Sequence, residues 1–503
     1  MKLSYGRRVF VGLVFLLLLT WPLWAELREV VIMQTTDMHG VFEDGDSPKD
    51  GSWLRIATMV KKWRQSEGAE KCLLIDCGDN VQGTLTTALS RGMAGIVPLE
   101  AMKYDAWIPG NHELDYGVER FSELAGRVKG IVLCGNLQVK GKEPFPAWRL
   151  FEKNGVKVAV IGVSASYAKN WMLETEFAKL EVETAFATLE RVLPQVHQTK
   201  PDVIVLATHQ AWFEGADTRG VNEISKIAKC FPEIDVILGA HSHRLLPGRR
   251  IGRRSWYMQP GCHGEYLGIV RVTVDTERHA VVSIEGRTQE VTKDYVEDEE
   301  LRKALTGYLE AAKVERKRLI KGNLAMPVKA YGRPGVSCQT SELICRALAE
   351  VSGADVVLHG RLSKKDLPAG RVTAQDLFEL VPYENSIVTA EVTREELGEI
   401  VAEQWRNKTH YSFCGLWGAD MKLGANAETA VITRLWKGEW PDGGRVKLAL
   451  NNHTAAGSGR FTVLRGILDR PTSHTQDTKI MTRDAVEAYL SKRENLVISV
   501  GKD

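Results

Sequence analysis

The sequence predicts an α/β fold of two domains, and three observations lead to that prediction. At 503 residues the chain is longer than one ordinary domain. From about Arg28 to Asp275, short apolar runs alternate with stretches of helical periodicity, which is typical of sheets buried under helices. A highly charged segment then precedes a second region of the same type. Hydrophobic residues make up 44% of the chain and charged residues 26%, so both domains can bury a core.

The first 25 residues have the pattern of an export signal. Lys2, Arg7 and Arg8 precede the apolar run VFVGLVFLLLL, and the small residue Ala25 follows WPLW. A charged stretch, an apolar stretch and a small residue before the cut are the three parts of a signal peptide. We therefore expect residues 1–25 to be removed and the protein to be periplasmic or secreted, with an uncleaved anchor as the alternative. The arginine pair leaves both the general secretory and the twin-arginine routes open.

Seven apolar runs between residues 28 and 275 are predicted strands. Each is short, rich in β-branched or other apolar residues, and bounded by polar residues or glycine. In chain order they are EVVIMQTTD (29–37), KCLLIDCGD (71–79), DAWIPGN (105–111), GIVLCGN (130–136), VKVAVIGVS (156–164), DVIVLATHQ (202–210) and DVILGAHSH (235–243). The helix between the first two is indicated by Trp53, Ile56, Val60 and Trp63, which recur on one helix face.

Residues 296–320 are predicted to form a helix between the domains. The segment is highly charged and helical in period, and it contains no proline and one glycine, Gly307. We expect a linker helix within residues 296–325, between a first domain at 26–295 and a second α/β domain at 326–503.

The eight cysteines suit an oxidising compartment but do not reveal a disulfide pattern. Their spacing is irregular and no CxxC occurs, which argues against a zinc ribbon. Cys72 and Cys77 are five residues apart in one predicted strand, point to opposite faces, and are not expected to pair.

Five of the predicted strands end in side chains that can bind a metal. The motifs are TTDMHG, DCGDNVQG, GNHELD, ATHQ and GAHSH. Because the carboxyl ends of strands in α/β sheets meet at one crevice, we expect these side chains to lie close together. The candidate ligands are Asp37, His39, Asp79, Asn111, His209, His241 and His243.

The ligand types and their number favour two divalent ions. Imidazole, carboxylate and amide groups suit zinc, manganese or iron better than calcium. Asp37 and His39 are two residues apart and would point the same way from an extended backbone, as would His241 and His243. Seven ligands exceed what one tetrahedral ion takes and fit two ions that share a carboxylate. Hydrolases use two ions about 3.5–4 Å apart to hold a phosphoryl group during displacement.

TTDMHG, GDNVQG, GNHELDYG, THQ and GAHSH resemble the motif series of calcineurin-like metallophosphoesterases, and more narrowly the 5′-nucleotidase and UDP-sugar hydrolase family. The resemblance continues through MQPGCHGEYLGIVRV and covers most of residues 28–275. It implies a four-layer αββα sandwich with one ion held by Asp37, His39 and His243. The second ion would be held by Asn111, His209 and His241, with Asp79 bridging both.

The resemblance also implies roles for the remaining residues of GNHELDYG. His112 would hydrogen-bond the phosphate or the leaving oxygen, and Asp115 would orient its imidazole. A carboxylate that holds one ring nitrogen fixes the tautomer and stabilises the charged ring. The two residues are three apart and are within reach if the segment turns into a helix. Glu113 is expected to have a polar structural role.

Residues 326–503 resemble the substrate-binding domain of the same family more faintly, through GADVVLHG, DLPAGRVTAQDLFELVPYEN and SFCGLWG. The resemblance implies that Tyr383 stacks on a nucleobase, although a core or interface role fits that residue equally well. A second aromatic would come from NNHTAAGSGRF as His453 or Phe461.

Two departures from the family pattern affect the second domain. The usual arginine-based phosphate grip is replaced by HGRLSKKD, which leaves Arg361, Lys364 or Lys365 as candidates. A lysine ammonium does not reproduce the bidentate fork of arginine. The acidic residue expected in the glycine-rich turn is also missing, and Gly459 stands near its place.

We therefore expect an exported hydrolase with two divalent ions, zinc, manganese or similar, that cleaves phosphate esters of nucleotides. The net charge of +2 gives no electrostatic reason to expect a nucleic-acid polymer or a membrane surface as partner. We expect a monomer without a stable membrane anchor that acts on a small-molecule phosphate ester. The alternatives are a 2′,3′-cyclic-nucleotide phosphodiesterase/3′-nucleotidase, a thiosulfohydrolase of the same architecture, and a non-catalytic nucleotide-binding protein.

Overall fold

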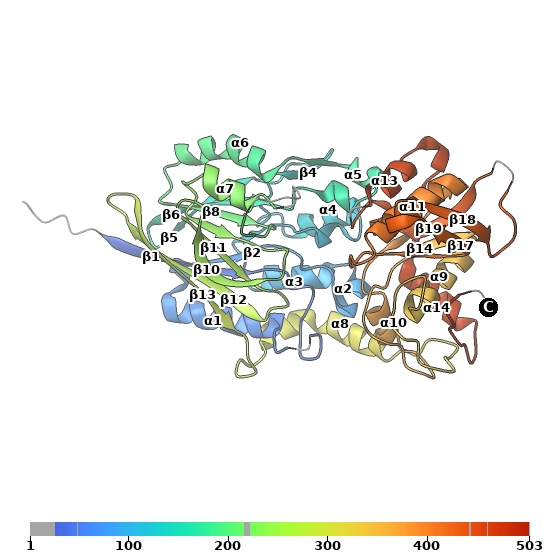
Figure 1. Ribbon diagram of the computed structural model, residues 1–503. Coiled ribbons are helices and arrows are strands. Elements are labelled where there is room, and N and C mark those ends of the chain that lie inside the picture. Colours follow the sequence, from blue (N-terminus) through green and yellow to red (C-terminus); the bar gives the residue numbers. More distant parts are fainter. Residues whose placement is uncertain (1–25, 48, 216–221, 442–443, 460, 502–503) are drawn as a thin grey trace, which may run out of the picture.

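The computed structural model describes residues 26–47, 49–215, 222–441, 444–459 and 461–501, so the expected signal peptide lies outside the described residues. Figure 1 shows two lobes side by side, the first coloured blue to green and the second orange to red. The first lobe contains a five-stranded and a six-stranded sheet, the second contains a five-stranded sheet, and each lobe also has a two-stranded pair.

The first sheet of the first domain has the strand order β13-β12-β1-β2-β3. Strands β1, β2 and β3 are parallel, whereas β12 and β13 add to β1 as an antiparallel hairpin. The bounds are β1 Leu27–Thr35, β2 Cys72–Asp76, β3 Ala106–Trp107, β12 Tyr266–Asp275 and β13 Ala280–Glu290.

The second sheet has the order β10-β11-β9-β8-β6-β5. Its four central strands are parallel, and β5 and β10 close its two edges in antiparallel pairing. The bounds are β5 Trp148–Lys153, β6 Val156–Val163, β8 Val203–Thr208, β9 Val236–Leu238, β10 Leu245–Ile251 and β11 Ser255–Pro260. Strands β4 Leu137–Val139 and β7 Leu180–Val182 pair separately.

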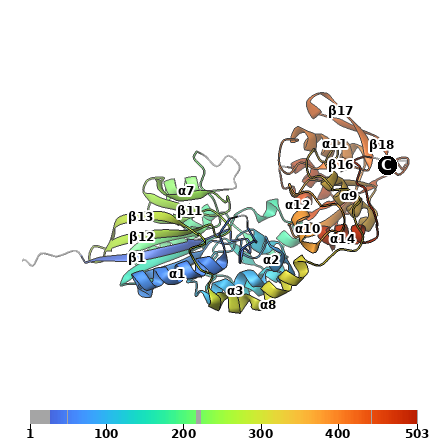
Figure 2. The ribbon, with the colours of Figure 1, turned by 90° about the horizontal axis from the view of Figure 1, so that it is seen from below.

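Helices cover the outer faces of both sheets, which gives the four-layer αββα sandwich that the resemblance implied (Figure 2). Ile32 and Ile75 of the first sheet and Val158 and Val205 of the second belong to one buried apolar cluster between the sheets. The helices are α1 Trp53–Glu67, α2 Leu85–Ser90, α3 Met93–Ala101, α4 Val118–Arg127, α5 Glu174–Phe177, α6 Ala185–Gln198, α7 Ile224–Cys230 and α8 Glu299–Arg316.

Helix α1 forms where the apolar spacing predicted a helix. The Ser52 side chain accepts a hydrogen bond from the backbone N–H of Arg55 and caps its first turn. Trp53, Ile56 and Val60 are buried on one face. The apolar stripe therefore determines both the position of the helix and the face that it turns to the sheet.

One predicted strand is wrong. GIVLCGN (130–136) contains no regular strand and makes only an isolated bridge between Val132 and Trp107. The backbone N–H of Leu133 donates to Trp107, at the edge of the first sheet, whereas that of Gly135 donates to Gly162 in the second. Because the segment crosses from one sheet to the other, its apolar residues are buried without forming a ladder.

Helix α8 occupies residues 299–316 inside the expected linker, and it packs along the first domain (Figure 1). Leu301, Leu305 and Leu309 are buried in the same cluster as residues of α1 and α3. The chain then enters the second domain, where the backbone N–H of Ile320 donates to Val372.

The second domain is a five-stranded sheet with helices on both faces, in the order β16-β14-β19-β15-β20. Its strands are β14 Val356–His359, β15 Ser386–Val392, β16 Gly415–Trp417, β19 Val446–Asn451 and β20 Gln476–Met481, with β17 Ala419–Leu423 and β18 Ala430–Leu435 paired apart from it. Its helices are α9 Gln339–Ser352, α10 Ala374–Leu380, α11 Arg394–Arg406, α12 Asn452–Ala455, α13 Thr462–Leu468 and α14 Thr482–Ser491.

Polar contacts join the two domains near α5 and the segment before it. The hydroxyl of Ser458 donates to the carbonyl of Asn170 over 2.7 Å. Arg465 donates to the carbonyl of Met172 over 3.2 Å and pairs with Glu174 at 3.1 Å.

All eight cysteines lie in the described part of the chain and none forms a disulfide. Among the described residues, no helix combines the length and the apolar character that crossing a bilayer requires.

Candidate metal centre

The seven candidate ligands lie together in the loops that follow β1, β2, β3, β8 and β9. Five of them have left-handed backbone conformations that side-chain-bearing residues seldom adopt. Their φ angles are 49° for Asp37, 47° for His39, 61° for Asp79, 71° for His241 and 57° for His243. The predicted extended backbone is therefore wrong for both the Asp-x-His and the His-x-His pair. Asp37 and His39 still bring their ligand atoms into one group as predicted, whereas His241 and His243 do not. The local backbone is bent at each of these residues.

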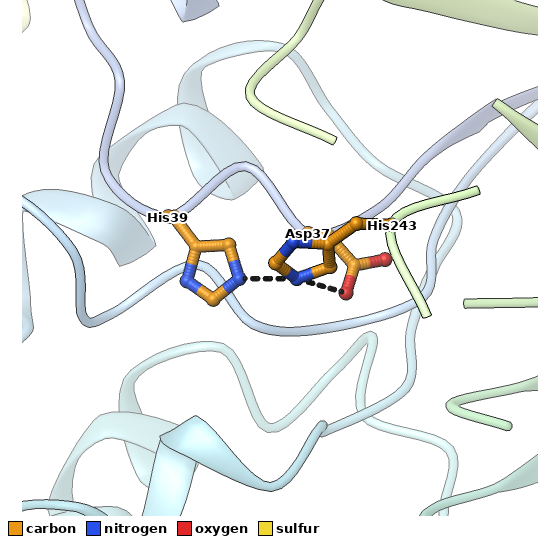
Figure 3. A group of neighbouring side chains, drawn as sticks. All are labelled: Asp37, His39 and His243. Carbon is orange, nitrogen blue, oxygen red and sulfur yellow. Dashed lines mark hydrogen bonds and ion pairs between the residues drawn. The ribbon is translucent and has the colours of Figure 1, made fainter. Parts of the chain in front are cut away.

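Asp37, His39 and His243 form the first group, with their ligand atoms within 4.8 Å of one another (Figure 3). The Nε2 atoms of His39 and His243 are 3.0 Å apart, and Nε2 of His243 is 3.4 Å from Oδ1 of Asp37. Figure 3 shows the three polar ends pointing toward one another from two segments far apart in the sequence.

Asp79, His209 and His241 form the second group, again within 4.8 Å. Oδ2 of Asp79 is 3.0 Å from Nε2 of His209. Oδ1 of Asn111 is 3.2 Å from the same nitrogen and 2.8 Å from Nδ1 of His241. Oδ2 of Asp79 is also 4.0 Å from Nε2 of His39, so this carboxylate lies between the two groups. His241 and His243 thus belong to different groups, although only one residue separates them.

Backbone carbonyls orient two of the imidazoles. Nδ1 of His39 is 3.1 Å from the carbonyl oxygen of Gln82, and Nδ1 of His209 is 2.6 Å from that of Cys77. A ring whose Nδ1–H donates to a carbonyl leaves the Nε2 lone pair free for a metal. In both residues Nε2 is the atom that faces the other ligands.

Burial and neighbouring charges divide the four histidines into two kinds. Burial lowers the pKa of His39 to about 3 and that of His241 to about 4, so both rings are neutral. Burial also acts to lower the pKa of His209 and His243, but Asp79 and Asp37 respectively outweigh it. The pKa values of these two rings rise to about 9 and about 10.

The donor set fits a pair of divalent ions. The seven side chains supply imidazole nitrogens, carboxylate oxygens and one amide oxygen, a set that suits zinc, manganese or iron. Asp37 and Asp79 are almost completely buried, at 0% and 1% exposure, and buried carboxylates are costly unless cations balance them. Protons on His209 and His243 supply that charge in the ion-free protein, and divalent ions would replace them.

Glu113, for which only a polar structural role was expected, joins the second and third of these loops. Its fully buried carboxylate accepts hydrogen bonds from the backbone N–H groups of Asp79, Asn80 and Gly110 at 2.9, 2.8 and 2.6 Å. Burial, with a further contribution from the Asp79 charge, raises its pKa to about 7. Asp79 is one of these donors and Asn111 directly follows Gly110. Glu113 therefore fixes the positions of two candidate ligands relative to each other. No local pattern would have assigned those three donors to it.

His112 and Asp115 form the pair that the sequence predicted. Residues 112–114 make a 3₁₀ turn, and Nδ1 of His112 is 2.8 Å from Oδ2 of Asp115. The backbone N–H of His112 donates to Oδ1 of Asp79 over 2.9 Å, which fixes the pair beside both groups. Burial acts to lower the pKa of His112, but Asp115 and Asp79 together raise it to about 10, so the ring is cationic at neutral pH.

Tyr383 of the second domain lies on a loop that contacts the candidate centre. Gln82, whose carbonyl faces His39, donates from its side chain to the carbonyl of Pro382 over 2.7 Å. The Tyr383 side chain is 41% exposed. Its pKa is raised by burial and further by the charge of Asp115, so its ring lies within electrostatic reach of the His112–Asp115 pair.

The two candidates for a second aromatic differ in position. Desolvation is the main cause that lowers the pKa of His453 to about 4, and the charges of Asp115 and His112 act on it in opposite directions, so His453 lies within electrostatic reach of the same pair. Phe461 is fully buried in the core of the second domain with Leu464 and Ile467. The prediction that Phe461 offers a surface to a substrate is therefore wrong for this structure, because its ring has no exposed face.

Two of the three candidate phosphate-binding cations have partners within the second domain. Arg361 donates to the carbonyl of Ala330 over 2.9 Å, and Lys365 pairs with Glu379 at 2.6 Å. Lys364 is exposed. Across the described parts of the chain, none of the three has a hydrogen bond or ion pair with the first domain.

Comparisons with known families match both domains. Residues 30–245 match the calcineurin-like phosphoesterase family, and residues 323–466 match the 5′-nucleotidase C-terminal domain. The first match covers the loops of all seven candidate ligands, and the second covers Tyr383, Arg361 and His453.

The chain is similar to curated proteins and to a solved structure. It is 24% identical to Protein UshA of Yersinia enterocolitica over 423 residues, which cover 74% of this chain and 76% of that protein. It is 22% identical to Endonuclease YhcR of Bacillus subtilis over 398 residues, 74% of this chain but only 32% of that longer protein. A structure from Staphylococcus aureus assigned to the 5′-nucleotidases superposes with a TM-score of 0.78 at 19% identity, covering 95% of this chain and 99% of the other.

Proposed function

Because the chain belongs to the calcineurin-like phosphoesterases that carry a 5′-nucleotidase C-terminal domain, and is therefore a metal-dependent phosphoester hydrolase, we propose that its substrates are nucleotides or nucleotide sugars. The observation that carries this proposal is the position of Asp79. It lies between two groups of ligand atoms and beside the His112–Asp115 pair, and Gln82 of the same loop contacts Pro382, the neighbour of Tyr383.

In this proposal Asp37, His39 and His243 hold one divalent ion, and Asn111, His209 and His241 hold a second. Asp79, whose carboxylate lies between the two groups, would serve both. Two such ions would lower the pKa of a bound water and screen the charge on the phosphoryl oxygens. The backbone bonds to His39 and His209 keep Nε2 of each ring aimed at its ion.

His112 supplies a proton donor at the phosphoryl group or the leaving oxygen. Asp115 accepts from Nδ1, which leaves the Nε2–H of the charged ring as the group that donates. The hydrogen bond from the backbone N–H of His112 to Asp79 holds the residue beside the side chains that would bind the ions. Such placement strengthens an interaction as negative charge develops in the transition state.

The second domain supplies recognition of the base. Tyr383 presents a partly exposed ring, and both Tyr383 and His453 lie within electrostatic reach of the His112–Asp115 pair. A base stacked on an aromatic side chain gains about 1–3 kcal/mol. Tyr383 and His453 therefore favour nucleotides over phosphate esters that lack a base.

A hydrolysis panel tests the proposal. The metal-loaded protein is offered 5′-, 3′- and 2′,3′-cyclic nucleotides, UDP-glucose, thiosulfonate conjugates and p-nitrophenyl phosphate. We expect turnover of a 5′-nucleotide or of UDP-glucose that a chelator abolishes and manganese or zinc restores. Nucleotide binding without turnover in the metal-loaded protein would instead indicate a binding protein, and a preference for cyclic or thiosulfonate substrates would indicate one of the two other hydrolases.

Tyr383→Ala tests the base-recognition step within that panel. Losing one stacked base should raise KM for a nucleotide roughly tenfold and leave p-nitrophenyl phosphate hydrolysis unchanged. Tyr331→Ala is the matched control, since Tyr331 is a second-domain tyrosine with 70% exposure. An equal loss for both substrates would show that Tyr383 acts through folding rather than through the base.

We also propose that the protein is exported and acts as a monomer on small substrates. The charged and apolar pattern of residues 1–25 supports export, and the net charge of +2 gives no electrostatic reason to expect a nucleic-acid polymer or a membrane surface as the partner. N-terminal sequencing of the protein from its natural host is expected to begin near Glu26.

A further inference from the structure

A third group of metal-binding side chains lies beside the candidate centre and outside its seven ligands. Cys262, His263 and Glu265 offer a sulfur, a ring nitrogen and a carboxylate oxygen within 4.8 Å of one another. All three residues are half-buried. We propose that they form an additional metal site of the type that binds zinc.

The loop that carries these residues is held in a defined shape. The backbone N–H of His263 donates to the carbonyl of Asp37 over 2.8 Å, and that of Glu265 donates to the carbonyl of Cys262 over 3.1 Å. Gly264 has a φ of 66°, and a Cβ there would lie 2.7 Å from Cε of Met38. The three side chains are therefore positioned by a tight turn packed on the segment of Asp37 and Met38, and are not gathered by chance on a free loop.

The ligand chemistry favours zinc. Thiolate, imidazole and carboxylate are the three protein ligands that zinc takes, and a half-buried position leaves a fourth place for water. In a tetrahedral zinc site, bonds of about 2.0–2.3 Å put neighbouring ligand atoms roughly 3.3–3.8 Å apart. Small side-chain rotations bring ligand atoms that lie within 4.8 Å of one another to these distances. The ligand atoms in each of the two groups of the candidate centre lie within the same limit of 4.8 Å.

The site is distinct from the candidate centre but adjacent to it. The ring centroids of His263 and His39 are 5.7 Å apart, and those of His263 and His243 are 5.9 Å apart. None of the seven residues of the candidate centre contains sulfur. An ion bound here would link the turn at 261–265 to the segment that carries Asp37 and His39.

Two contacts compete with metal binding at this site. The Cys262 thiol interacts with the side chains of both His243 and His263, and binding a metal would replace its interaction with His243. Lys49 Nζ lies 2.6 Å from Oε2 of Glu265. Because the Lys49 side chain is 63% exposed, it can swing away into water when a cation arrives.

Cobalt(II) substitution tests the site without using turnover. A thiolate bound to cobalt(II) gives a charge-transfer absorption band in the near ultraviolet that nitrogen and oxygen ligands do not give. We expect titration of the full-length protein to produce this band and to end at about three equivalents of cobalt per chain. Cys262→Ser should remove the band and lower the endpoint to about two equivalents, whereas Cys230→Ser, at an exposed cysteine, should change neither.

Lys49→Ala and Glu265→Gln extend the test to the carboxylate. Removing the competing ammonium should tighten binding of the thiolate-bound ion by several-fold, and removing the carboxylate charge should weaken it. A band that persists in Cys262→Ser would overturn the proposal. The proposal would also be overturned if the Cys262→Ser protein lost the band but still bound as many equivalents of cobalt as the unsubstituted protein. Cys262 would then bind the ion of Asp37, His39 and His243. Absence of any band at saturation would also overturn it.

Discussion

At the residue scale, the charges of the candidate centre depend on which histidines carry a proton. His209 and His243, with pKa values of about 9 and about 10, are protonated at neutral pH beside Asp79 and Asp37. His39 and His241, with pKa values of about 3 and about 4, are not. The ion-free site thus balances its two central carboxylates with two ring protons.

Metal loading at pH 7 should therefore release about two protons per chain, because only a neutral imidazole binds a metal. The apparent affinity should fall as the pH is lowered from about 9, since protons compete with the ion at His209 and His243. Titration calorimetry in two buffers of different ionisation heat measures the number released. Equal heats in both buffers would contradict this account of the four rings.

Substitution of His112 tests whether this residue acts in turnover or in metal binding. His112→Ala should lower kcat by about 10²–10⁴-fold while metal content stays unchanged, since Nδ1 of its ring pairs with Asp115 and the residue belongs to neither group of ligand atoms. Asp79→Ala should instead remove both ions, because that carboxylate lies between the groups. Metal analysis and p-nitrophenyl phosphate kinetics on the two variants decide the matter. Loss of metal from His112→Ala would show that His112 is a ligand.

At the scale of single elements, the loop after β3, which carries Asn111, lies very close to the loop after β2, which carries Asp79. A Cβ at Gly110 would lie 2.2 Å from Oδ1 of Asp79 and 2.7 Å from Cε1 of His209. There is no room for a side chain at residue 110, because the Glu113 carboxylate accepts hydrogen bonds from the backbone N–H groups of both Gly110 and Asp79. Only a glycine allows these two loops to approach so closely.

Gly110→Ala should therefore lower both metal content and turnover strongly, although it adds a single methyl group. Gly126→Ala, in α4, is the matched control because a Cβ there meets nothing within 4 Å. That change should leave activity intact and slightly stabilise the helix, by about 0.4–1 kcal/mol. Full metal content in Gly110→Ala would mean that the loops separate at little cost.

At the scale of the whole molecule, the proposed ions belong to one domain only. All seven ligands lie in the first domain, whereas the second has its own apolar clusters on both faces of its sheet. A ligand that binds only the folded state stabilises it by about 2.7 kcal/mol at a hundred times its dissociation constant.

Chelation should thus lower the unfolding temperature of the first domain by several degrees and leave that of the second nearly unchanged. Calorimetry with and without chelator measures both transitions. The Gly110→Ala protein provides the control, because a chain that cannot hold the ions should show no shift. An equal shift of both transitions would mean that the two domains unfold as one unit.

Many features of the fold follow from patterns read along the chain. The apolar runs around Ile32, Ile75 and Val205 predicted central strands, and Trp53, Ile56 and Val60 predicted α1. The prediction failed at GIVLCGN, whose apolar residues are buried between two sheets. Burial requires apolar residues there, but hydrogen-bond partners from two different sheets prevent a strand from forming.

The sequence by itself determined the chemical types of the ligands and the strand ends at which they stand. Those are local properties, because they depend on side-chain chemistry and on the period of the apolar residues. Only the tertiary structure revealed that left-handed turns carry His241 and His243 into different groups, that Glu113 joins two loops, and that Phe461 is buried. Each of these depends on left-handed backbone turns and on contacts between residues far apart in the chain, which local periodicity does not encode.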